Sequence, residues 1–120
     1  LRRNPGQVHA LVGYAQVAQV RGDAAMAEEL YSRATDFHER NVAALIHKAL
    51  YLELSLKDLA AADELYGRAR KLDEAKAREL HDRLLPRHAV VVRLAASYQA
   101  RKRREGGRQQ RFVLPKWAGE

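Results

Sequence analysis

The sequence predicts an all-α fold built from repeated helical hairpins. The octet AEELYSRA at residues 27–34 returns as ADELYGRA at 62–69, with six of the eight letters identical. In both octets Ala, Tyr and Ala are spaced by four and three residues, which places them on one face of a helix. Hydrophobic residues make up 47% of the 120-residue chain, so we expect a globular fold of one domain.

The first predicted hairpin covers about residues 4–40. Asn4 is suited to cap its first helix, because a short polar side chain can accept backbone N–H bonds there, and Pro5 fits the first helical position. The sequence RGDA at 21–24 then marks a turn, in which Asp23 can cap the second helix. The positions expected to face inward are Leu11, Ala15, Ala27, Tyr31 and Ala34.

The second predicted hairpin covers about residues 41–84. Its first helix starts at Asn41, and Asp58 can cap its second helix. Lys57 stands where the first hairpin has the turn glycine, Gly22. The positions expected to face inward are Leu45, Ala49, Ala62, Tyr66 and Ala69.

Beyond residue 72 the register changes, and the sequence leaves two alternatives open. Either the second helix continues to about Leu84, or a separate helix starts near Asp73. We favour a long or broken helix through 58–84. After Gly67 this segment contains no Gly or Pro that would interrupt a helix, and its leucines continue one apolar stripe.

A closing helix is predicted at about 87–104, after Pro86. It would cover the open end of the stack, because stacked helical units bury their apolar faces only against neighbours. Residues 1–104 would then form one helical repeat domain. Residues 105–120 would form an irregular tail, which is basic and aromatic.

These residues resemble the tetratricopeptide repeat family. Leu11 and Leu45 are 34 residues apart, as are Ala15 and Ala49, and the Ala–Tyr–Ala octets follow at a spacing of 35. The resemblance covers about two repeats over residues 4–72, and the closing helix would cap them. It implies an α-solenoid of antiparallel helix pairs that binds other proteins.

The resemblance also implies a binding groove. In this family the first helices of the repeats line a concave surface, which receives a peptide, a helix or a neighbouring subunit. The register of the repeats assigns these positions to the groove: His9, Val12, Gln16, Gln19, Ala43, Ile46, Leu50 and Glu53.

Positive charge is concentrated at the C-terminal end. The net charge is +7, and residues 101–120 hold seven Lys and Arg against two Glu. This cluster is open to three interpretations: a solvated helix end, a nuclear import signal, or a contact with RNA phosphates or an acidic partner. The candidate contact residues are Arg101, Lys102, Arg103, Arg104, Arg108 and Arg111.

The sequence contains no pattern typical of catalysis or metal binding. The five histidines include no pair at the three- or four-residue spacing of a helical metal site, and there is no cysteine. No apolar run approaches the roughly 20 residues that span a bilayer. We therefore expect no catalytic residue, cofactor, metal, small-molecule substrate or membrane insertion.

Taken together, these patterns predict a non-enzymatic scaffold or adaptor that works inside the cell as a segment or subunit of a larger assembly. Its location would be cytoplasmic or nuclear, and the sequence leaves an organelle open as well. The alternative is an RNA-binding or RNA-processing helical-repeat protein that uses the basic C-terminal segment. Steep salt dependence would favour RNA, whereas sensitivity to Ile46→Arg or Leu50→Arg would favour the groove.

Overall fold

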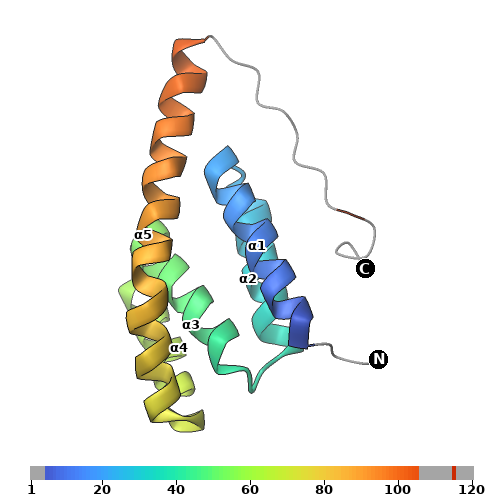
Figure 1. Ribbon diagram of the computed structural model, residues 1–120, viewed down its shortest axis with the longest axis vertical. Coiled ribbons are helices and arrows are strands. Elements are labelled where there is room, and N and C mark those ends of the chain that lie inside the picture. The colour runs from blue at the N-terminus through green and yellow to red at the C-terminus, as the bar shows by residue number, and fades with distance from the viewer. Residues whose placement is uncertain (1–4, 106–114, 116–120) are drawn as a thin grey trace.

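The structure, a computed structural model, describes residues 5–105 and Pro115 (Figure 1). Helices form most of this part of the chain and no strand forms in it, so the all-α class is confirmed there. The elements are α1 (Pro5–Arg21), α2 (Ala24–Phe37), α3 (Val42–Tyr51), the π-helical turn η1 (Leu52–Leu56), α4 (Leu59–Leu72) and α5 (Glu74–Arg104).

Helices α1 and α2 form the first hairpin. The connection turns sharply at Gly22, whose φ of 82° suits glycine, and the Oδ1 of Asp23 then accepts a bond of 3.1 Å from the Met26 N–H. The predicted cap at Asp23 is therefore confirmed. The inward positions Leu11, Ala15, Ala27, Tyr31 and Ala34 are all buried.

Helices α3 and α4 form the second hairpin. Asn41 caps α3 through a 3.0 Å bond from the Ala44 N–H, and Asp58 caps α4 through a 3.1 Å bond from the Ala61 N–H. Between them, η1 ends at Lys57, where the backbone is left-handed with φ 58°. The inward positions Leu45, Ala49, Ala62 and Ala69 are buried, and Tyr66 is half-buried.

Lys57 therefore adopts a left-handed backbone conformation at the position where the first hairpin has Gly22. A left-handed conformation costs a non-glycine residue about 1–2 kcal/mol. We expect Lys57→Gly to raise the free energy of unfolding by about 1 kcal/mol in urea titrations. Lys48→Gly, inside α3, is the control and should lower it by about 1 kcal/mol. A Lys57→Gly protein less stable than the parent would contradict this account of the turn.

The chain after α4 differs from the favoured prediction. Helix α4 ends at Leu72, and Asp73 caps a new helix by accepting a 3.0 Å bond from the Lys76 N–H. A continuous helix through 58–84 is thus wrong: the helix breaks at Asp73, and a separate helix starts there.

The predicted boundary at Pro86 is also wrong. Helix α5 continues through the proline for 31 residues, so the expected closing helix at 87–104 is only its C-terminal part. Proline removes one backbone bond, to the carbonyl of Asp82, but both residues are exposed, so water can reach that carbonyl. One buried stripe continues across this point at intervals of three and four residues, through Ala77, Leu80, Leu84, His88 and Val91.

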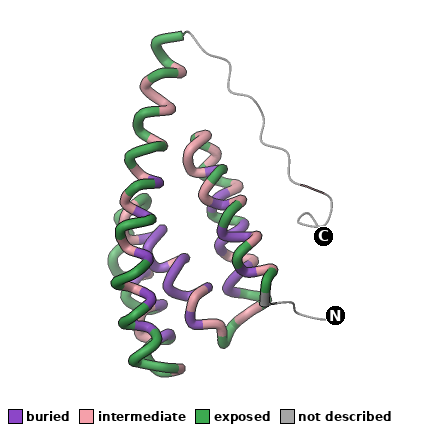
Figure 2. Tube along the Cα trace, in the orientation of Figure 1, coloured by how far each residue is buried: buried purple, intermediate pink, exposed green. Residues whose placement is uncertain are grey.

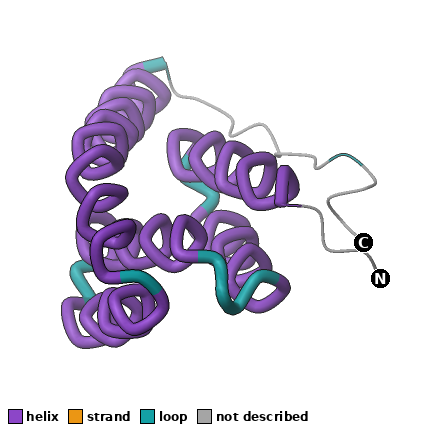
Figure 3. Tube along the Cα trace, turned by 60° about the horizontal axis from the view of Figure 1, so that its bottom comes forward, coloured by secondary structure: helices purple, strands orange, loops and turns teal. Residues whose placement is uncertain are grey.

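Helix α3 lies in the middle of the molecule and contacts the other four helices (Figure 3). Eight of its ten residues are buried. Helix α5 packs across α1, α3 and α4, so it touches both hairpins. After Val91 no residue of α5 is buried, and this end of the helix extends past the end of α1 (Figure 2).

Candidate functional site

Helix α5 occupies part of the expected binding groove. Ile46 and Leu50 of α3 are 1% and 0% exposed, and they belong to one core cluster with Leu80 and Leu84 of α5. Leu50 is enclosed, and Ile46 borders only a small pocket of about 250 Å³ beside Tyr66 and Ala77. Placing the two residues in an open groove is therefore a prediction that the structure corrects. Ile46→Arg and Leu50→Arg would consequently test the fold and not the binding surface.

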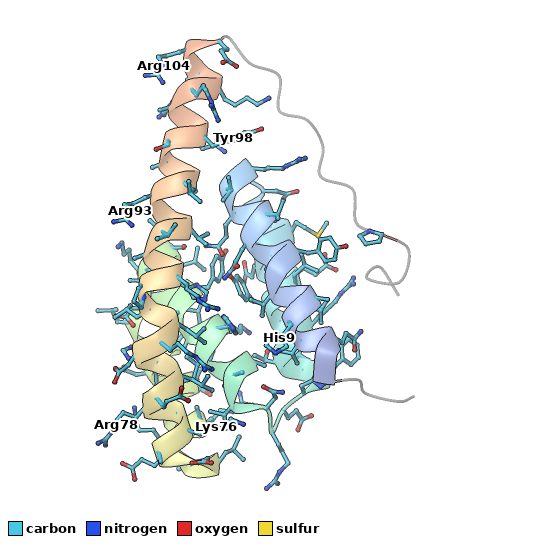
Figure 4. All side chains as sticks on the ribbon, viewed as in Figure 1. His9, Lys76, Arg78, Arg93, Tyr98 and Arg104 are labelled. Carbon is cyan, nitrogen blue, oxygen red and sulfur yellow. The ribbon has the colours of Figure 1, made fainter. Side chains whose placement is uncertain are left out.

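The accessible remainder of the groove is a cleft between α1, α3 and α5. Its volume is about 350 Å³. His9, which lies on the side of α1 towards α5 in Figure 4, contributes to it. Four of the eight predicted groove residues line this cleft: His9, Val12, Gln16 and Ala43. Six further residues complete the lining: Gly13, His47, Leu80, Arg83, Leu84 and Arg87.

The cleft combines an apolar floor with a rim of hydrogen-bond donors. Val12, Leu80 and Leu84 are buried at the floor, whereas Arg83 and Arg87 are exposed at the rim. None of the lining residues carries a carboxylate. Such a site suits an anionic group attached to an apolar one, because guanidinium donors match carboxylate and phosphate oxygens.

A pair of buried histidines connects α3 to α5, and one of them, His47, lines the cleft. The Nδ1 of His47 lies 2.9 Å from the Nε2 of His88, and both side chains are buried. Burial lowers the pKa of His47 to about 3, with the neighbouring charges of His88, His9 and Arg87 acting in the same direction. Burial also lowers the pKa of His88 to about 4. Both rings are therefore neutral at pH 7, and one donates an N–H to the other.

Two predicted groove residues, Gln19 and Glu53, lie outside the cleft and bind tyrosines of the hairpins. The Tyr31 hydroxyl donates a 2.6 Å bond to Oε1 of Gln19, whose Nε2 donates to Ser55 Oγ at 2.9 Å. Likewise the Tyr66 hydroxyl donates a 2.7 Å bond to Oε1 of Glu53. Gln19 links α1 to α2 and to η1, and Glu53 links η1 to α4. These contacts therefore stabilise the fold.

The predicted basic cluster is only partly described. Arg101, Lys102, Arg103 and Arg104 end α5; the three arginines are exposed, and Lys102 is half-buried with its Nζ 5.8 Å from the centre of the Tyr98 ring. Arg108 and Arg111 lie outside the described residues, as does the rest of the expected tail apart from Glu105 and Pro115.

Sequence reasoning missed the contribution of α5 to the cleft. Arg83 and Arg87 lie on either side of Pro86, a local signal for a helix boundary, so the sequence alone does not place the two arginines on one helix. The signal that could have revealed them is a run without acidic residues from Arg83 to Arg104. His47 and His88 are 41 residues apart and had no local pattern to connect them.

Within the described residues, no helix combines the length and apolar character that crossing a membrane requires. The same residues contain no group of three or more His, Asp or Glu side chains placed to hold a metal ion. In comparisons with known proteins, no family model, curated protein or solved structure matches this chain.

Proposed function

We propose that this protein is a non-enzymatic interaction module, a scaffold or adaptor of the tetratricopeptide type. It binds a segment of a partner protein in the cleft between α1, α3 and α5, inside the cell and within a larger assembly. The observation that carries the proposal is the cleft itself, because the first helices of both hairpins line it with four residues that the repeat register selects.

The contacts of the cleft support this proposal in a second way. Its lining comes from three helices that pack on one another, so the binding surface is held by the same core that holds the fold. A rigid surface of this kind binds a flexible segment without first having to be ordered itself.

RNA binding is the second candidate function. Four consecutive basic residues, 101–104, form the exposed end of α5 and favour it. This candidate predicts an affinity that falls steeply as salt rises, because each neutralised phosphate releases counterions.

Gly13 offers a direct test of the cleft. Gly13 lines the cleft, and a Cβ added there meets no atom within 4 Å, so the backbone leaves room for a side chain at this position. We expect Gly13→Trp to reduce about tenfold the recovery of partner proteins by affinity purification with crosslinking. Gly67→Trp, on α4 outside the cleft, is the matched control and should leave recovery unchanged.

The proposal fails if a Gly13→Trp protein with the circular dichroism of the parent recovers the same partners in the same amounts. Loss of recovery in both variants would also count against it, because the effect would then not depend on the cleft.

A further inference from the structure

Three helical segments of the protein contain no acidic residue. Neither α1 nor α3 contains an Asp or Glu, and neither does the stretch 83–104 of α5. These three segments form the cleft and its surroundings. Their basic residues are Arg21, Lys48, Arg83, Arg87, Arg93, Arg101, Lys102, Arg103 and Arg104. These three segments therefore carry only positive charge, and the nearest carboxylates on α5 are Glu79 and Asp82, which precede Arg83.

A single exposed stripe on α5 leads away from the cleft. It consists of Arg83, Arg87, Val90, Leu94 and Arg101, which we call the α5 stripe. Intervals of four, three, four and seven residues keep these side chains on one side of the helix. From its first to its last residue the stripe measures about 27 Å at 1.5 Å per residue.

The middle of the α5 stripe is apolar. Val90 is 41% exposed and Leu94 is 52% exposed, and no helix of the described fold covers them. Two neighbouring apolar side chains with charges on either side match the apolar core and polar rim of protein interfaces.

The charges of the α5 stripe are only partly compensated within the protein. Arg83 forms a 3.3 Å ion pair with Glu79 on the preceding turn. Arg87 and Arg101 form no ion pair within the described part of the chain. The guanidinium groups of Arg87 and Arg101, on either side of Val90 and Leu94, can therefore bind carboxylates of a partner.

We propose that the cleft and the α5 stripe together bind an acidic amphipathic segment of a partner protein. Carboxylates of the segment meet Arg83, Arg87 and Arg101, and its large apolar side chains pack on Val90 and Leu94. This inference rests on the proposed function and adds the chemical character of the partner.

The stripe fits a protein segment better than a nucleic acid. Val90 and Leu94 interrupt the positive charges, and phosphates placed over them would lose hydration without gaining a counter-charge. Nucleic-acid surfaces also offer aromatic rings for stacking, whereas the Tyr98 ring next to the stripe already has the Lys102 ammonium over it.

A displayed library of random peptides of about 20 residues, enough to follow the stripe in helical form, is the first test. Peptides would be selected on the full chain and on the Gly13→Trp protein. We expect the peptides that only the parent selects to be enriched in Asp and Glu and in large apolar residues. Peptides that depend on Gly13 but lack this acidic enrichment would overturn the inference and leave the proposed function standing. If no selected peptide depends on Gly13, the result would count against both this inference and the proposed function.

A charge reversal on α5 is the second test. Arg87→Glu should weaken the selected peptides about tenfold or more in fluorescence anisotropy, and replacing their acids by lysine should restore binding. Arg93→Glu makes the same charge change on the side of α5 away from α1 (Figure 4), and it should change affinity less than about twofold. Equal losses in both variants would show that only net charge matters and would overturn the inference.

A single-stranded oligouridylate tests the competing partner in the same assay. We expect it to bind more weakly than the selected peptides at about 150 mM salt. If it binds more tightly and displaces them, the surface is a nucleic-acid site and the inference is wrong.

Discussion

Tyr31→Ala should lower the free energy of unfolding by about 4 kcal/mol, a large share of the total for a domain of this size. Tyr31 is fully buried, its ring stacks on Tyr51 with centroids 4.7 Å apart, and its hydroxyl binds Gln19. Truncation leaves a cavity in the cluster that α1, α2 and α3 share. Urea denaturation followed by circular dichroism measures the loss.

Tyr66→Ala is the internal comparison for this prediction. Tyr66 occupies the same place in the second octet but is only half-buried, so its truncation should cost about 2 kcal/mol. Tyr31→Phe removes the hydroxyl alone and should cost about 1 kcal/mol. Equal losses for Tyr31→Ala and Tyr66→Ala would contradict the difference in packing between the two hairpins.

Acidification from pH 7 to pH 5 should destabilise the protein by about 4 kcal/mol through His47 and His88. Their folded-state pKa values of about 3 and about 4 lie below the ordinary value of 6.5. The unfolded chain therefore binds more protons below pH 6.5, and stability falls as the pH falls from there towards 4. Each histidine contributes about 1.4 kcal/mol per pH unit in this window and nothing above it.

The double variant His47→Leu/His88→Leu tests the origin of this pH dependence. Leucines keep the site filled and apolar, so most of the slope between pH 6.5 and 5 should disappear from urea titrations. His9→Gln, at the exposed rim of the cleft, is the control and should retain the slope. A double variant with the slope of the parent would show that other groups cause the acid sensitivity.

The hairpins could be predicted from the sequence because their signals are local. The Ala–Tyr–Ala spacing places the buried faces of α2 and α4, and a polar side chain at each start, such as Asp23 or Asn41, caps the helix that follows. Even the unusual backbone at Lys57 follows from its alignment with Gly22.

The position of α5 could not be predicted in the same way. Pro86 is a local signal for a helix boundary, but burial of a stripe on both sides of it outweighs the one lost backbone bond. As a result, four of the eight expected groove residues line the cleft, while Ile46 and Leu50 lie on a surface that α5 covers.

The path of α5 across both hairpins has a consequence for how the protein unfolds. In arrays whose units touch only their neighbours, units can melt one after another. Here Gln99 donates a 3.5 Å bond to the carbonyl of Val20, 79 residues away, while the Leu80 end of α5 is embedded against α3 and α4. Opening of the second hairpin would expose apolar surface on α5, and opening of the first would break the contacts between α1 and α5. The two hairpins and the long helix thus form a single cooperative unit, which should lose its structure in one transition.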